Sequence, residues 1–239
     1  MSRRVPRAGS DPWRGPLLPP GWRPDREAPP DEEDGPRRRA VVDAEGRIRL
    51  GGRTTVVLRP LRPDQGHLLM QGFDRLSPTS RYRRFLAPVP RLTDAMLAFL
   101  TSVDEVDHRA FGALVDEGPG RPGPIPAGVV RWVRTKADPV VAELAVTVID
   151  DYQGQGLGGL LVDVAVLDAL AHGVERFEGI MLGENVISRR MLARAGATFR
   201  PEGGGVLAFR LPLAARADVL RRSPLPAVIT PARLPTTTA

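Results

Sequence analysis

The sequence contains no cysteine among its 239 residues. Disulfide bonds, thiolate metal sites and cysteine nucleophiles are therefore excluded. The three histidines, His67, His108 and His172, stand far apart and form no metal-binding motif. No apolar run of about eighteen residues is present, and the N-terminus lacks the apolar segment of a signal peptide. We expect a cytoplasmic protein without a metal and without membrane contact.

Lysine is also nearly missing, because Lys136 is the only lysine among 34 basic residues. Arginine replaces it throughout, beside 25 glycines and 25 prolines, which is typical of a GC-rich genome. The formal net charge of +6 would suit a nucleic-acid partner. The arginines are however mixed with acids, and neither zinc spacing nor a recognition helix is present. We therefore expect no nucleic-acid binding.

Composition divides the chain into three parts. Residues 1–40 are rich in proline, arginine and acids and contain few branched aliphatic side chains. Such a segment buries too little apolar surface to offset the entropy of the ordered chain. We predict a disordered tail over residues 1–45, one folded domain over 46–213 and a flexible extension over 214–239.

Apolar periodicity and turn residues predict a regular order of elements. Strands are expected at 54–59, 110–115, 127–133, 140–149, 176–182 and 206–211. Helices are expected near 64–76 with Asp64 as N-cap, after Thr93, at 158–171, and at 188–195 ending at Gly196. Ser77-Pro78 marks the boundary between the first two helices, and 116–126 is a hairpin connection. The predicted fold class is α/β, a mixed sheet with helices on both faces.

A glycine-rich turn from Gln153 to Gly159 follows one apolar run and opens another. It formally satisfies the dinucleotide pattern G-x-G-x-x-G, but four residues separate the first glycine from the strand, and no acid stands at a clear ribose-binding position. A Walker P-loop is excluded, because no Lys-Ser or Lys-Thr follows the glycines. The alternative spacing is Gln153-x-x-Gly156-x-Gly158.

This spacing, within residues 142–199, resembles the pyrophosphate loop of the GNAT family of N-acetyltransferases and its surrounding strands and helices. Residues 76–85 and 100–104 look like the first half of the same domain in the Pat-like branch, whose characterised members acetylate protein lysines. The resemblance covers about residues 54–212. It implies a GNAT fold, acetyl-CoA as cosubstrate and an amine acceptor, with a protein lysine favoured.

The resemblance also implies a set of cofactor-binding residues. Backbone N–H groups of the loop, at a helix N-terminus, would hold the diphosphate without a metal. The strand before the loop would pair with the pantetheine as if a strand were added. Asn185 would contact the pantetheine arm, cap a helix, or do both. The set comprises Val146, Thr147, Val148, Gln153, Gly154, Gln155, Gly156, Leu157, Gly158, Gly159 and Asn185.

For catalysis, the resemblance points to Glu143, which matches the Ala-Glu-x-Ala position of the general base proposed in Pat-like enzymes. The alternative is a solvated glutamate in a salt bridge. Many family members carry a tyrosine general acid where this chain has Leu192, so the general acid stays unassigned. Two other functions remain open: acetylation of a small amine or antibiotic, and acyl-CoA binding without catalysis.

Two groups of charged residues lie outside these motifs. Asp104 and Asp107 could line an amine pocket, but acids at such positions more often cap helices or lie on solvated loops. The arginine cluster Arg81, Arg83 and Arg84 lies in the acceptor-side half and receives no cofactor role.

Overall fold

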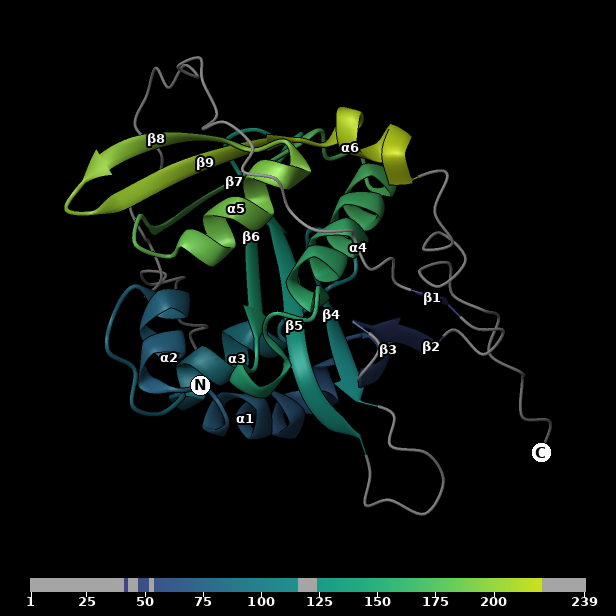
Figure 1. The fold of residues 1–239 in the computed structure, drawn as a ribbon, viewed down its shortest axis with the longest axis vertical. Helices are drawn as coiled ribbons and strands as arrows, with labels where there is room; N and C mark the ends of the chain where they lie inside the picture. Colours follow the sequence, from purple (N-terminus) through teal and green to yellow (C-terminus); the bar gives the residue numbers. More distant parts are fainter. Residues whose placement is uncertain (1–40, 43–46, 52–53, 116–123, 221–239) are drawn as a thin grey trace, which may run out of the picture.

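The computed structural model describes residues 41–42, 47–51, 54–115 and 124–220 (Figure 1). Within them, nine strands pair in the order β1-β2-β3-β4-β5-β6-β7-β9-β8. Neighbouring strands are antiparallel except β6 and β7, which run parallel. The strands are β1 Val41–Val42, β2 Arg47–Leu50, β3 Thr54–Pro60, β4 His108–Val115, β5 Ile125–Arg134, β6 Val141–Val148, β7 Arg176–Leu182, β8 Thr198–Gly203 and β9 Val206–Pro212.

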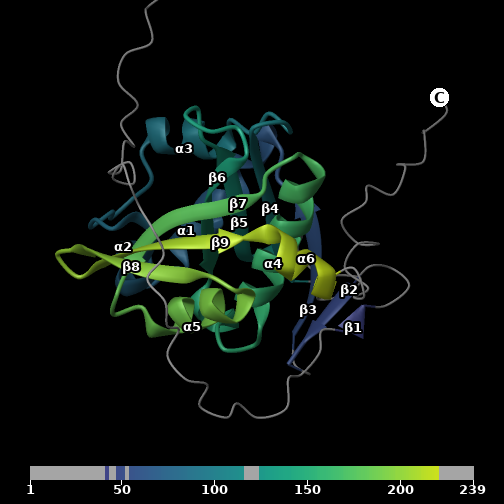
Figure 2. The same ribbon diagram turned by 90° about the horizontal axis from the view of Figure 1, so that it is seen from above.

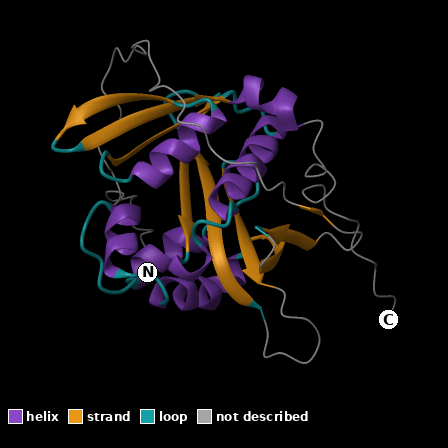
Figure 3. Ribbon diagram, in the orientation of Figure 1, coloured by secondary structure: helices purple, strands orange, loops and turns teal. Residues whose placement is uncertain are grey.

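Helices cover both faces of this sheet, as the sequence predicted (Figures 2 and 3). The helices α1, α2 and α3 lie on one face, and α4 and α5 lie on the other. They are α1 Gly66–Asp74, α2 Pro78–Phe85, α3 Asp94–Thr101, α4 Leu157–Ala171, α5 Val186–Ala195 and α6 Leu213–Leu220, with 3-10 turns η1 Pro63–Gln65 and η2 Asp150–Tyr152. None of the helices in the described part of the chain is both long and apolar enough to cross a membrane.

The helix α4 packs in the centre of the main core and fixes one face of the sheet. Nine of its fifteen residues are buried, because it contacts β4, β5, β6, α5 and α6. Its one buried acid, Asp168, accepts hydrogen bonds from Arg109 at 2.7 and 2.8 Å and from the Trp132 indole at 2.9 Å. These contacts hold α4, and therefore its N-terminus, at a fixed place beside β6.

The structure differs from the sequence-based expectation between the first two predicted helices. Ser77-Pro78 does not merely separate them but begins a further helix, α2, in which the Ser77 hydroxyl accepts from the N–H of Ser80. Proline is favoured at the first helical position, where its missing N–H has no intrahelical acceptor to lose. The predicted cap Thr93 does cap α3, by accepting from the N–H of Met96.

Other boundaries also shift. Asp64 does not cap the first long helix, because it lies inside η1, and α1 begins after Gln65 without a side-chain cap. Strands β1, β2 and β8 have no predicted counterpart, and β1 lies within residues 1–45, which were predicted to be disordered. At the C-terminal side, α6 continues to Leu220, past the expected boundary at 213, and buries Leu213 and Leu220. The tails at 1–40 and 221–239 and most of the 116–126 connection lie outside the described residues.

Candidate active site

The two parallel strands β6 and β7 separate shortly after they begin to pair. They are in register only at Val141↔Arg176, Ala142↔Phe177 and Glu143↔Glu178. Beyond this point β6 continues along β5, while β7 continues along β9 and turns away (Figure 1). A gap therefore opens toward the carboxyl ends of two parallel strands, where ligands bind in open α/β sheets.

The edge of β6 offers backbone groups to this gap. The N–H of Ile149 donates to the carbonyl of Ala127 on β5 at 2.9 Å. Because backbone groups of successive strand residues point in opposite directions, Thr147 also faces β5, and Val146 and Val148 face the gap. In agreement, the Val148 carbonyl accepts from the side-chain amide of Gln153 at 3.0 Å. An extended ligand could pair with this edge.

The glycine-rich turn lies at the mouth of the gap, between η2 and α4. Gly154 and Gly156 have φ values of 71° and 88°, in the left-handed region that glycine adopts without strain. A Cβ added at either position, or at Gly159, would meet no atom within 4 Å. Gly156 is the N-cap of α4, whose first N–H groups have no intrahelical acceptor. The turn thus presents open backbone donors at the positive end of a helix dipole.

The side chains of this turn brace it rather than face the opening. Gln155 Oε1 accepts from the Thr54 hydroxyl at 2.7 Å, and its amide donates to the Asp151 carbonyl at 3.2 Å. Leu157 is buried in the core. Gly158 allows close packing of α4 on α5, since a Cβ there would lie 2.8 Å from the sulfur of Met191.

The residues that hold the start of this turn in place were not identified from the sequence. Asp150 accepts from the N–H and hydroxyl of Ser77, at 3.0 and 2.8 Å, and from the Ser80 hydroxyl at 2.8 Å. Partial burial alone would raise the pKa of Asp150, but these hydrogen bonds outweigh it and lower the pKa. Arg75 donates to Asp151 at 2.8 Å. The cap signal Ser77-Pro78 was visible in the sequence, whereas the partner 73 positions away was not.

Glu143 lies where the strands part. Its side chain is exposed and occupies the last paired position of β6, opposite Glu178. Glu178 is buried, and its carboxylate accepts from Arg176 at 3.1 Å and from Arg210 at 2.9 Å. The acid that remains at the surface of the gap is therefore Glu143.

On the other side of the gap, Asn185 and Leu192 belong to α5. The Asn185 side chain accepts from the N–H of Ser188 at 3.2 Å and so acts as the N-cap. Leu192 is buried and packs into the core. Of the two tyrosines in the sequence, Tyr152 packs against both hydrophobic clusters, and its hydroxyl accepts from Arg75 at 3.4 Å. No phenol therefore occupies the α5 position at which the family resemblance would place a general acid.

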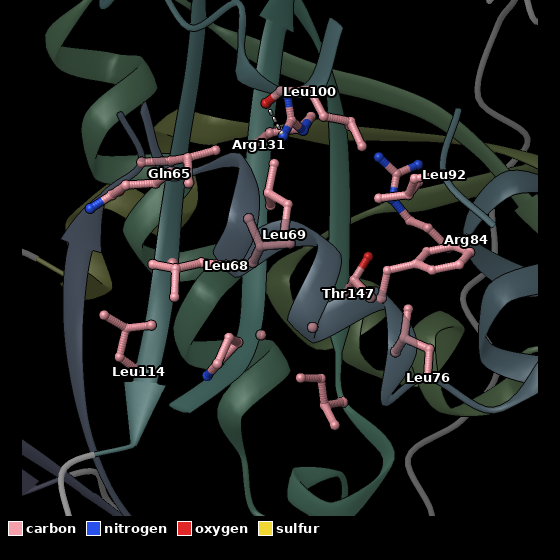
Figure 4. Close-up of a pocket in the computed structure, with 18 of the residues that line it drawn as sticks. Gln65, Leu68, Leu69, Leu76, Arg84, Leu92, Leu100, Leu114, Arg131 and Thr147 are labelled. Carbon is pink, nitrogen blue, oxygen red and sulfur yellow. Dashed lines mark hydrogen bonds between the residues drawn. The ribbon is translucent and has the colours of Figure 1, made fainter. Parts of the chain in front are cut away.

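A pocket of about 90 Å³ lies on the α1–α3 side of the sheet (Figure 4). Thr147 and Ile149 line it from β6, on the face shared with Glu143. None of the described residues that line it is acidic, and Arg84 and Arg131 reach into it. Its aliphatic walls include Leu68, Leu69, Leu76, Leu92, Leu100 and Leu114.

Asp104 and Asp107, the two acids considered for an amine pocket, have structural partners outside this pocket. One Asp104 oxygen accepts from the N–H groups of Val106, Asp107 and His108, at 2.8 to 2.9 Å. Asp107 pairs with Arg134 at 2.7 Å. Asp104 therefore caps a turn and Asp107 forms an ion pair at the surface, in agreement with the expectation that these acids cap elements or lie on solvated loops.

The family model described as the acetyltransferase (GNAT) family matches residues 78–197, which is half of the chain. The chain therefore belongs to the GNAT family of acetyltransferases.

Within that family the chain is similar to Pat-like proteins. It is 37% identical over 150 residues to the acetyltransferase Pat of Mycolicibacterium smegmatis, which covers 63% of this chain and 43% of Pat. It is 32% identical over 142 residues to the acetyltransferase PA5475 of Pseudomonas aeruginosa, covering 59% of this chain and 74% of the relative. The GNAT domain of S. lividans PAT superposes with a TM-score of 0.60 at 26% identity, covering 73% of this chain and 96% of that domain. The chain thus spans less than half of the length of the mycobacterial Pat.

Proposed function

We propose that this chain is an acetyl-CoA-dependent N-acetyltransferase that acetylates a protein lysine. The observation that carries the proposal is the separation of β6 from β7 after Glu143, with the open glycine turn at the mouth of the gap. The N–H groups from Gly154 to Gly159 hold the diphosphate as neutral donors, aided by the dipole of α4. No metal is required for this binding.

The edge of β6 binds the pantetheine as an added strand. Val146 and Val148 direct backbone groups toward the gap and supply the hydrogen bonds, as in β-strand addition. Thr147 contributes differently, because its backbone faces β5 and its side chain lines the pocket. The Asn185 amide nitrogen stays available at the other edge of the gap, since only the side-chain oxygen is used in the cap.

Glu143 acts as the general base. A lysine ammonium must lose a proton before its nitrogen can attack the thioester carbon, and Glu143 takes that proton directly or through one water. The new C–N bond then forms and the C–S bond breaks. With Leu192 at the tyrosine position, solvent supplies the proton to the departing thiolate.

The charges of the residues on the same face of the sheet as Glu143 indicate which kind of acceptor is favoured. A small polyamine would need an acidic pocket there, but the pocket on this face is lined by leucines and by three arginines, Arg59, Arg84 and Arg131. Glu143 itself is exposed, so a lysine on another protein can reach it. This arrangement favours a protein lysine over a small amine or an antibiotic.

One observation favours the alternative of a non-catalytic acyl-CoA-binding module. The α5 position that carries a tyrosine in many relatives holds the buried Leu192 here. A binding module would bind acetyl-CoA but release no CoA with any lysine-containing protein or peptide. Because the chain has no cysteine, a thiol reagent reports released CoA without background from this protein.

Calorimetric titration with acetyl-CoA tests the binding site. Gly156→Leu places a side chain at the mouth of the gap, and Gly173→Leu is its matched control at the other end of α4. Both glycines have positive φ, at 88° and 77°, and open space around a Cβ, so both variants bear a similar strain of about 1–2 kcal/mol.

We expect Gly156→Leu to lose binding and Gly173→Leu to retain it. The proposal fails if folded wild-type protein binds no acetyl-CoA, or if both variants bind it equally well.

A further inference from the structure

Three arginines line the pocket between α1–α3 and the sheet; Arg59 on β3 is exposed, whereas Arg84 and Arg131 lie among aliphatic side chains (Figure 4). Arg131 comes from β5 and is buried, with 5% of its surface exposed. Arg84 comes from α2 and keeps accessible surface although protein surrounds it, because it faces the pocket. The acceptor-side interior therefore contains two cations.

Among the residues that the structure describes, neither cation has a carboxylate counterion. Arg131 donates to Nε2 of His108 and to the carbonyl of Leu100, the latter at 2.9 Å. Burial and the charge of Arg131 lower the pKa of His108 to about 4, so this partner is neutral at pH 7. Arg84 lies over the ring of Phe85 at 5.0 Å. Within the described residues, no carboxylate forms an ion pair with either guanidinium.

Such an arrangement is unfavourable without an anion. Removing a charge from water costs several kcal/mol unless an opposite charge compensates it. Burial lowers the pKa of Arg84 to about 10, and burial together with the charge of Arg84 lowers the pKa of Arg131 to about 9. Both side chains are still protonated at pH 7, so the pocket keeps two positive charges in an apolar surrounding.

The size and the lining of the pocket restrict which kind of anion can bind in it. Its volume of about 90 Å³ is smaller than the roughly 150 Å³ of an apolar cavity that accepts benzene. A guanidinium binds a carboxylate through two parallel hydrogen bonds, and the leucine walls suit an aliphatic chain. We propose that this pocket binds a short-chain aliphatic carboxylate between Arg84 and Arg131.

Two sources could supply this group. One is a free short-chain acid, which would bind whether or not the chain transfers acyl groups. The other is the terminal carboxylate of a dicarboxylic acyl chain carried on CoA, since Thr147 connects the pocket to β6. Only the second source rests on the proposed function.

The test uses butyrate as the probe, with uncharged butyramide as its isostere and sodium chloride to match ionic strength. Calorimetry and thermal unfolding are measured on the wild type, Arg84→Met and Arg84→Lys. Arg91→Met is the matched control, because Arg91 is exposed and does not line the pocket. Acetyl-CoA binding, measured separately, shows that each variant keeps its fold and cosubstrate site.

We expect saturable butyrate binding by the wild type, with a dissociation constant of about a millimolar, and none of butyramide. Arg84→Met should weaken butyrate binding about 10- to 100-fold, as expected for loss of a charged hydrogen-bond partner. Arg84→Lys, which keeps the charge but not the two parallel donors, should weaken it less, and Arg91→Met should retain it. Without butyrate, Arg84→Met should be at least as stable as the wild type, because it removes an uncompensated buried charge. Absence of saturable binding, or equal binding by Arg84→Met, would overturn the proposal.

Thioether analogues of acyl-CoA, which cannot transfer their chain, identify the source. If S-carboxypropyl-CoA binds more tightly than S-butyl-CoA, excludes butyrate and loses its advantage in Arg84→Met, the acyl chain supplies the carboxylate. If butyrate binds equally in the presence of either analogue, the ligand is a free acid. Each result supports the site and assigns its source.

Discussion

Replacing Glu143 with glutamine tests the proposed general base directly. The change keeps the size of the side chain and removes its ability to take a proton. Glu143 is exposed, whereas Glu178 is buried and held by Arg176 and Arg210, so the change is made at an accessible side chain. Acetyl-CoA binding should be unchanged, because the proposed contacts come from the backbone of β6 and of the glycine turn. The expected effect is therefore confined to turnover.

The magnitude follows from the proton that must leave the acceptor. A positioned base contributes about 10²–10⁴ to the rate, so kcat/KM of Glu143→Gln at pH 7 should fall by that factor, or about 3–5 kcal/mol. The variant needs an amine that has already lost its proton. Because a free lysine has a pKa of about 10.4, its rate should rise about tenfold per pH unit between pH 7 and 9. Released CoA is measured with a thiol reagent, using saturating acetyl-CoA and a lysine-containing acceptor.

Glu175→Gln is the matched control, because Glu175 is also exposed but lies before β7, away from the gap. It should retain the wild-type rate and pH profile. The reasoning is refuted if Glu143→Gln turns over at nearly the wild-type rate at pH 7 while its acetyl-CoA affinity is normal. A lower rate that does not recover with pH would equally remove Glu143 from the role of base.

Three further predictions concern stability. Asp168→Ala removes a buried acceptor from Arg109 and Trp132 and should lower the free energy of unfolding in urea by about 3–5 kcal/mol, whereas Asp64→Ala, in an exposed pair with Arg62, should cost less than about 1 kcal/mol. Because the folded pKa of His108 is depressed to about 4, its contribution to stability is present above pH 6.5 and is lost as the pH falls toward 4; His108→Gln should flatten that part of the unfolding profile. Ser77→Ala removes the cap of α2 and the hydroxyl contact to Asp150 in one step, and should cost about 1–2 kcal/mol by thermal unfolding and raise the KM for acetyl-CoA.

Local signals in the sequence were sufficient for most of the fold. Apolar periodicity located the strand at 176–182, and Thr93 and Gly196 marked helix ends that the structure confirms. The helix α2 was missed because it is short, contains three arginines and has no buried residue, so no run of apolar residues marks it in the sequence. Strand β8 was missed for a related reason, since Pro201 and glycine interrupt it and its pairing with β9 shifts register there.

In the candidate site, only the backbone conformation of the glycine-rich turn was predictable from the sequence. The pattern of glycines indicated an open turn, and the left-handed φ values of Gly154 and Gly156 follow from it. Asp150 accepts a hydrogen bond from Ser77, and Arg84 lies near Arg131. Both contacts join residues far apart in the chain, so local sequence patterns do not predict them. No local pattern distinguishes Arg84 from Arg83 or Arg81, although the fold sends one of them into the pocket and uses Arg81 to bind three backbone carbonyls.

Contacts between residues far apart in the chain also explain why Glu143, rather than Glu178, is the candidate base. Both are strand glutamates at equivalent positions, paired across β6 and β7 on one face of the sheet. Glu178 lies on the side of the pair that β9 covers, so Arg210 reaches it from the next strand and Arg176 from its own. Glu178 is buried and held by two ion pairs, so an acceptor amine does not reach its carboxylate. Glu143 is the last residue of β6 that pairs with β7, so its exposed side chain lies where the gap begins. The separation of the two strands therefore opens the proposed cosubstrate site next to an exposed carboxylate.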